Sequence, residues 1–144
     1  MNSQGATELV QATSARWVAD SESDVVWAGE HEGRLGVRMA QSVRDFTTVW
    51  FDVGDLTIGY EAYVAPPPPR GVEEVYRQCL VRNRAWWRVH FALDAEGGLV
   101  LVGRSSLAAL DESVLDAALG SIYEAVELSF RAIVAAGFGR EKNS

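Results

Sequence analysis

A single α+β domain, with an antiparallel sheet packed against helices, is the architecture that three features of the sequence indicate. The chain has 144 residues, a length that suits one domain able to bury about two thirds of its extended surface. Segments in which apolar residues alternate with others are typical of half-buried strands. Three further segments carry apolar residues at helical spacing. The expected order is helix, three strands, helix, two strands, helix.

The first helix is expected over residues 7–19, with Thr7 as its N-cap. Residues 1–6 are small and polar, and we expect them to be disordered. The same expectation applies to residues 140–144, so the domain is placed at residues 7–139.

Three strands are expected before the second helix. Residues 35–40 alternate apolar side chains with others. Residues 47–53 and 56–64 flank Gly54-Asp55, a short turn that predicts an antiparallel hairpin. Residues 25–27 fit either a short strand or a tether, and the sequence leaves both open.

A run of four prolines, Pro66 to Pro69, is expected to form a stiff polyproline II spacer before the second helix. That helix is expected to end at Asn83, acting as a left-handed C-cap, with Arg82 near the negative end of the helix dipole. The next hairpin is predicted to bury Trp87 and to place Trp86 and Arg88 on the opposite face.

The last elements have the clearest patterns. Both faces of residues 99–103 are apolar, which indicates a strand inside the sheet. Asp111 is expected to cap a final helix of about 25 residues that ends at Gly137. Such a helix would run about 37 Å and cross the whole sheet.

Composition limits the function classes. The formal charge of −7 disfavours general attraction to nucleic acids and to anionic membranes. The one cysteine, Cys79, excludes an internal disulfide and suits a reducing compartment. We find no signal-peptide pattern and no stretch of about 20 apolar residues. A cytoplasmic protein is therefore expected.

No catalytic, metal-binding or cofactor-binding residue is expected. The two histidines, His31 and His90, lie in an acidic turn and on a strand face, where ordinary structural roles are favoured. The sequence contains none of the common zinc, nucleotide or nucleophile motifs. Of the carboxylate pairs, Asp52 and Asp55 would be the first candidates with His90 if a metal were found.

Arginines interleaved with tryptophans form a more open case, at Arg82, Arg84, Trp86, Trp87 and Arg88. Such a pattern can stack single-stranded bases, but alternation along a strand separates these side chains. Tryptophan and arginine are also enriched at protein-binding hot spots. One interpretation is that the exposed sheet face binds a partner through Trp50, Trp86 and neighbouring arginines, and the main alternative is a plain structural role.

The segment from Val72 to Leu107 carries a distinctive set of residues: Tyr76, Arg77, Leu80, Arg82, Asn83, Phe91 to Asp94, Gly97, Gly98 and Leu101 to Arg104. The resemblance at these positions is to the YbjN-domain family of bacterial proteins. It continues upstream through Thr47 to Val64 and downstream to Gly137-Phe138. The resemblance implies a fold like that of type III secretion chaperones and the role of a regulator without assigned chemistry.

We therefore expect a non-catalytic protein-binding or regulatory module that forms a homodimer with an unidentified protein partner. One alternative is a sensor of anionic small molecules that uses Arg82, Asn83 and Arg104, because guanidinium groups hold carboxylates and phosphates well. The other reading of these three residues is structural, with Asn83 as cap and Arg104 anchoring a turn. A single-stranded nucleic-acid binder and a cryptic enzyme are less favoured.

Overall fold

A computed structural model describes residues 1–139 of the chain. These residues form three α-helices, one short 3₁₀ helix and six strands. In chain order they are α1 (Ser3–Ala19), β1 (Val25–His31), β2 (Arg34–Ala40), β3 (Phe46–Val53), β4 (Thr57–Ala65), α2 (Val72–Ala85), β5 (His90–Leu93), β6 (Leu99–Ser106), η1 (Leu107–Ala109) and α3 (Glu112–Gly137).

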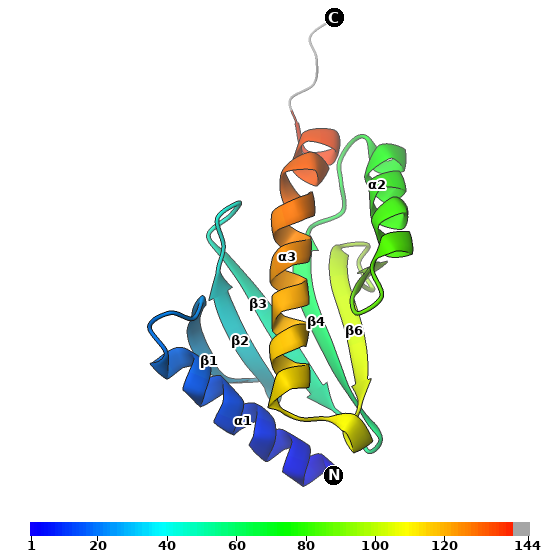
Figure 1. Ribbon diagram of the computed structural model, residues 1–144. Helices are drawn as coiled ribbons and strands as arrows, with labels where there is room; N and C mark the ends of the chain where they lie inside the picture. Colours follow the sequence, from blue (N-terminus) through cyan, green and yellow to red (C-terminus); the bar gives the residue numbers. More distant parts are fainter. Residues whose placement is uncertain (140–144) are drawn as a thin grey trace, which may run out of the picture.

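The six strands form one antiparallel sheet in the order β1-β2-β3-β4-β6-β5. Figure 1 shows α1 and α3 lying across the same face of this sheet, with α2 beside the upper part of α3. Within residues 1–139 the opposite face carries no helix (Figure 1), and the two sheet ends are β1 and β5. The open face is therefore an available surface.

The core lies between the sheet and the helices. Strand residues on the covered face, such as Val37, Phe51 and Leu101, are almost completely buried. They pack with the apolar stripe of α3, represented by Ile122 and Ile133. Complete burial of one such side chain is worth about 1.5–3 kcal/mol, so this layer supplies most of the stabilisation of the domain.

The predicted fold class and element order are confirmed, and the open question at residues 25–27 is resolved because they begin β1. A two-residue turn, Glu32-Gly33, joins β1 to β2. Both turn residues have positive φ, 51° and 79°, as a type I′ hairpin requires. Residues 99–103 also lie inside the sheet as expected, between β4 and β5.

The predicted start and end of the last helix are confirmed, whereas the predicted start of the first helix is wrong. Asp111 caps α3 by accepting a 2.9 Å hydrogen bond from the Val114 amide, and the helix ends at Gly137. The first helix begins at Ser3, because Asn2 accepts a 2.8 Å bond from the Gly5 amide and serves as the cap. Disorder was thus wrongly predicted for residues 3–6, whereas the prediction for residues 140–144 lies outside the described residues.

Candidate functional site

The two edges of the sheet differ in whether their outward-facing backbone N–H and C=O groups have hydrogen-bond partners. At β5, the side chain of Asn83 pairs with the strand as a neighbouring strand would. Its Oδ1 accepts from the Phe91 amide at 2.7 Å, and its Nδ2 donates to the Phe91 carbonyl at 3.1 Å. Because one amide side chain satisfies both outward-facing groups of Phe91, this edge is closed at the middle of a four-residue strand.

The structure corrects the predicted role of Asn83. Helix α2 continues to Ala85, and its C-cap is Trp86 with φ −96° and ψ 140°. Asn83 therefore lies inside the helix and is no left-handed cap. Its position on the helix turn facing β5 suits an amide side chain, because a primary amide offers a donor and an acceptor side by side, as a peptide group does.

At the other edge, β1 is free. Residues of an antiparallel strand alternate between those bonded to the neighbour and those pointing away from it. Because His31 and Arg34 close the two-residue hairpin, the alternation directs the backbone groups of Ala28 and Glu30 to the outside. Within residues 1–139, no backbone hydrogen bond outside the sheet ladder involves residues 26–31.

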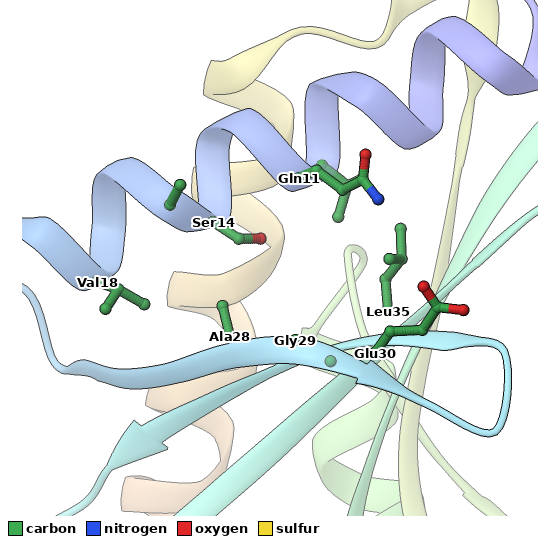
Figure 2. Close-up of a pocket in the computed structure, with 10 residues that line it drawn as sticks. Gln11, Ser14, Val18, Ala28, Gly29, Glu30 and Leu35 are labelled. Atoms are coloured by element: carbon green, nitrogen blue, oxygen red, sulfur yellow. The ribbon is translucent and has the colours of Figure 1, made fainter.

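A hollow of about 390 Å³ lies between α1 and this edge. Figure 2 shows the side chains of α1 above and those of β1 below it, with Glu30 pointing toward the helix. Its lining is mainly small and aliphatic: Val10, Ala15, Val18, Ala28, Gly29, Leu35 and Gly36, with Gln11, Ser14 and Glu30 as the polar members. The hollow is open to solvent along the free strand.

One polar group in this hollow is unpaired. Ser14 is 5% exposed, and its Oγ has no hydrogen-bond partner within the described residues. A buried hydroxyl without a partner costs about 1–3 kcal/mol. In Figure 2 the Ser14 side chain projects from α1 into the space above Ala28. A ligand in the hollow would be in position to form a hydrogen bond with the Ser14 hydroxyl.

The open face of the sheet carries aromatic and guanidinium groups in alternation. The rings of Trp27 and Trp50 lie over the paired glycines Gly29 and Gly36, so closely that a Cβ on Gly36 would be 2.6 Å from Trp50. The guanidinium of Arg38 stands 5.5 Å from the centre of the Trp27 ring. Trp50 is thus on the open face as predicted, beside an aromatic residue that sequence analysis did not single out.

Arg34 neutralises much of this face. Its guanidinium holds both oxygens of Asp52, at 2.9 and 2.7 Å, and reaches Glu61 at 3.5 Å. These carboxylates raise the pKa of Arg34 further, chiefly through the hydrogen bond with Asp52. Arg104 is exposed on β6 opposite Gly59, beside the same two acids. Arg34 is therefore compensated by acids on this face, whereas Arg38 has no salt bridge among the described residues.

Trp86, Trp87 and Arg88 do not form the predicted strand, because β5 begins only at His90. Trp86 is half-buried against Phe91, with ring centres 5.8 Å apart. Trp87 is 76% exposed, which reverses the predicted burial, and Arg88 stacks on it at 4.3 Å. Trp86 is consequently absent from the open sheet face, and the predicted pairing of Trp86 with Trp50 is wrong.

The remaining predicted residue, Arg82, donates from Nη2 to the carbonyl of Leu128 on α3 at 3.3 Å. It joins the two helices, and the amide of Asn83 is fully used by Phe91. Arg104 lies on β6, on the open face of the sheet. The three residues proposed as an anion site thus belong to different surfaces or are already occupied.

Residues 1–139 contain no group of three or more histidine, cysteine, aspartate or glutamate side chains placed to hold a metal. Burial raises the pKa of the Cys79 thiol to about 11, so it is not a thiolate near neutrality. No helix within these residues has the length and apolarity to cross a bilayer.

Comparison with known protein families decides the classification. The family model YbjN, described as "Putative bacterial sensory transduction regulator", matches residues 12–135. The chain belongs to the YbjN family. This match covers both sheet edges and all of the hollow's lining except Val10 and Gln11, and it confirms the resemblance found in the sequence.

Curated relatives of this YbjN protein carry no assigned function in their names. It is 38% identical over 105 residues to the uncharacterized protein ML2442 of Mycobacterium leprae, covering 73% of this chain and 57% of the relative. It is also 38% identical over 86 residues to the uncharacterized protein Rv0487 of Mycobacterium tuberculosis, covering 60% of this chain and 47% of the relative. The chain spans about half the length of these relatives.

Solved structures share the fold of this YbjN domain. The ExsC-ExsE complex matches with a TM-score of 0.63 and 21% identity, covering 92% of this chain and 97% of the other. The ExoU-SpcU complex of the Pseudomonas aeruginosa type III secretion system gives 0.57 and 17%, covering 83% and 93%. The Yersinia pestis chaperone SycH with a fragment of YscM2 gives 0.54 and 10%, covering 84% and 98%. A fold like that of type III secretion chaperones is confirmed.

Proposed function

We propose that this protein is a non-catalytic regulatory module that binds an extended segment of another protein along β1. The observation that carries the proposal is the open strand edge beside a hollow with an unpaired Ser14 hydroxyl. An added strand would pair with the outward backbone groups of Ala28 and Glu30. Main-chain hydrogen bonds would give affinity, and side-chain pockets would give selectivity.

The geometry gives each side of such a segment a different environment. Alternate residues of a strand point to opposite faces. Side chains on the helix side would enter the hollow under α1, between Val10, Val18 and Leu35. Side chains on the other side would lie beside Trp27 on the open face of the sheet. The partner segment would therefore alternate side chains that fit the hollow with side chains that pack beside Trp27.

Similar structures support this class of function by analogy of fold. Each of the three structures named above contains a protein in complex with another protein or protein fragment. At identities of 10–21% the likeness concerns the fold, so the partner and any pathway must be found for this chain itself. We propose a cytoplasmic location on the composition alone.

We also propose a homodimer, formed through α2 and its neighbours. Several large apolar side chains are exposed around α2, β5 and α3: Leu80, Val81, Leu93 and Leu128. A shallow apolar hollow of about 250 Å³ lies between Tyr76, Leu80 and Leu93. Contiguous exposed apolar surface of this kind often marks an interface, and this one leaves the β1 edge free.

Light scattering at micromolar concentration tests the dimer. A mass near twice 15.7 kDa is expected, and Leu80→Arg should return the mass of one chain by placing a charge in the apolar contact. Val26→Arg, at an exposed apolar residue of β1, is the matched control and should leave the dimer intact. A monomer in the unmodified protein would refute this part of the proposal.

Segment binding can be tested without knowing the partner. A phage-displayed library of random nonapeptides is selected on the protein, and the enriched peptides are assayed against Glu30→Pro and Glu30→Ala. Proline removes the outward amide at a position where an edge strand tolerates it, whereas alanine keeps that amide. Selected peptides should lose binding to the proline variant only. Equal binding to both variants would refute strand addition at β1.

A further inference from the structure

We infer that the segment held at β1 is basic and places a hydrogen-bonding side chain, such as threonine, against Ser14. This inference rests on the proposed strand addition and goes further by naming the chemistry of the partner. Two independent observations carry it: uncompensated negative charge along the edge, and the buried, unpaired hydroxyl in the hollow.

The charge is concentrated on β1 and the loop that leads into it. Residues 20–33 contain five exposed carboxylates and neither lysine nor arginine: Asp20, Glu22, Asp24, Glu30 and Glu32. Among the residues described, none of these has a salt bridge to lysine or arginine, and Glu32 meets only the exposed His31 at 3.9 Å. Two nearby arginines are already paired, Arg16 with Glu112 and Arg34 with Asp52. The nearby Arg38, on β2, has no salt bridge among the described residues and stacks on Trp27 at 5.5 Å, on the open face of the sheet and away from the hollow.

This pattern selects the charge of the occupant. An extended segment lying along residues 26–31 runs past Glu30 and the acidic loop, so lysine or arginine along it would meet attractive charge. A second copy of the chain that added its own β1 is the wrong occupant of this edge, because the same acidic residues would face one another. Complementary charge raises the association rate and suppresses acidic partners more than it adds affinity.

The hollow selects one side chain of the segment. Most of its lining is aliphatic, but Ser14 presents an unpaired hydroxyl and Glu30 points into the space from below (Figure 2). A purely aliphatic side chain would leave Ser14 buried without a partner. A small side chain with a hydroxyl fits the aliphatic walls and can exchange a hydrogen bond with Oγ.

Two labelled nonapeptides of alternating valine and threonine test the charge, one with lysine and one with glutamate at the ends and centre. By fluorescence anisotropy the lysine peptide should bind about tenfold more tightly at low ionic strength, with the difference largely lost at ~1 M salt. Glu30→Lys should reduce or reverse the preference for the lysine peptide over the glutamate peptide. Glu96→Gln, at an exposed acid in the β5–β6 turn, is the control and should leave it unchanged.

The side-chain preference is tested by replacing the threonines of the lysine peptide with valine. The unmodified protein should bind the threonine peptide about fivefold more tightly, as expected for one net hydrogen bond. Ser14→Ala should abolish this difference while still binding both peptides. An unchanged difference in Ser14→Ala would overturn the role of Ser14.

The outcomes separate the inference from the proposed function. If both charged peptides bind equally well and both lose binding to Glu30→Pro, strand addition stands and the basic partner is wrong. If the glutamate peptide binds more tightly, the charge argument is likewise overturned. If neither peptide binds, or if binding survives Glu30→Pro, the proposed function fails together with the inference.

Discussion

Replacing Asn83 by alanine should both destabilise the protein and open its second sheet edge. The asparagine side chain makes two hydrogen bonds to Phe91, at 2.7 and 3.1 Å. Net values of about 0.5–1.5 kcal/mol for each bond predict a loss of about 1–3 kcal/mol in the free energy of unfolding. Asn83→Asp keeps only the acceptor and sets a carboxylate against the Phe91 carbonyl, so it should be destabilised as well.

Urea denaturation followed by tryptophan fluorescence measures this loss, and amide hydrogen exchange reports on the edge itself. The Phe91 amide should exchange much faster in Asn83→Ala, because its acceptor is gone. Arg84→Ala, at an exposed position of the same helix, should change stability by less than about 0.5 kcal/mol. A loss below ~0.3 kcal/mol in Asn83→Ala, or unchanged protection of Phe91, would refute this account of the closed edge.

Three further predictions have expected outcomes. Gly103→Ala should lower the free energy of unfolding by well over 1 kcal/mol, measured by heat or urea, because its Cβ would stand 2.2 Å from the Tyr60 ring. Its control, Gly120→Ala, places the Cβ in open space on α3 and should raise the free energy of unfolding by about 0.5–1 kcal/mol, so equal effects would contradict the packing. Ser14→Ala should leave stability unchanged or raise it in the same assay, because it removes an unpaired hydroxyl, and a clear loss would show that Ser14 has a partner within the fold. The hydrogen bond from Ser42 lowers the pKa of Glu127. This carboxylate therefore stabilises the fold at pH values above its unfolded pKa, and that stabilisation is lost as the pH falls through the lower folded pKa. Glu127→Gln should make stability depend less on pH in the acid range, and an unchanged dependence would contradict the assignment.

Periodicity was sufficient for the architecture because each element has a strong local pattern. The apolar stripe of α3, the Asp111 cap and the alternation in β2 and β3 are local properties, and each was predicted from neighbouring residues. The first helix shows the limit of this approach. Thr7 and Asn2 are both good N-caps, and the choice between them depends on the packing of Ala6 in the core.

The candidate site depends on contacts between distant segments, which no single stretch of sequence reveals. Asn83 looks like a helix cap in its local sequence, but eight residues later Phe91 supplies the partner for its amide. Trp86 and Trp87 follow the alternation of a strand, yet α2 extends to Ala85 and the chain bends before β5. Asn83 and Trp87 were therefore placed wrongly, and the strand expected at Trp86 to Arg88 is absent, whereas Arg82 lies in the last turn of α2 as expected.

Only one feature of the sequence pointed to the hollow and the β1 edge, namely the acidic residues between positions 20 and 32. Ser14 and Trp27 were not singled out, because a serine in a helix and a tryptophan near a strand are ordinary features. Their importance follows from the position of α1 over β1 and from the fact that none of residues 1–139 forms a strand beyond β1. Both facts concern the assembled sheet.

Amide hydrogen exchange with and without the lysine nonapeptide is the most direct test of the open edge. The account predicts that the amides of Ala28 and Glu30 become protected when the peptide saturates the protein, while protection of the Phe91 amide, already bonded to Asn83, does not change. Peptide binding that leaves both β1 amides unprotected, and protects residues around α2 or the open face near Trp50 instead, would contradict it.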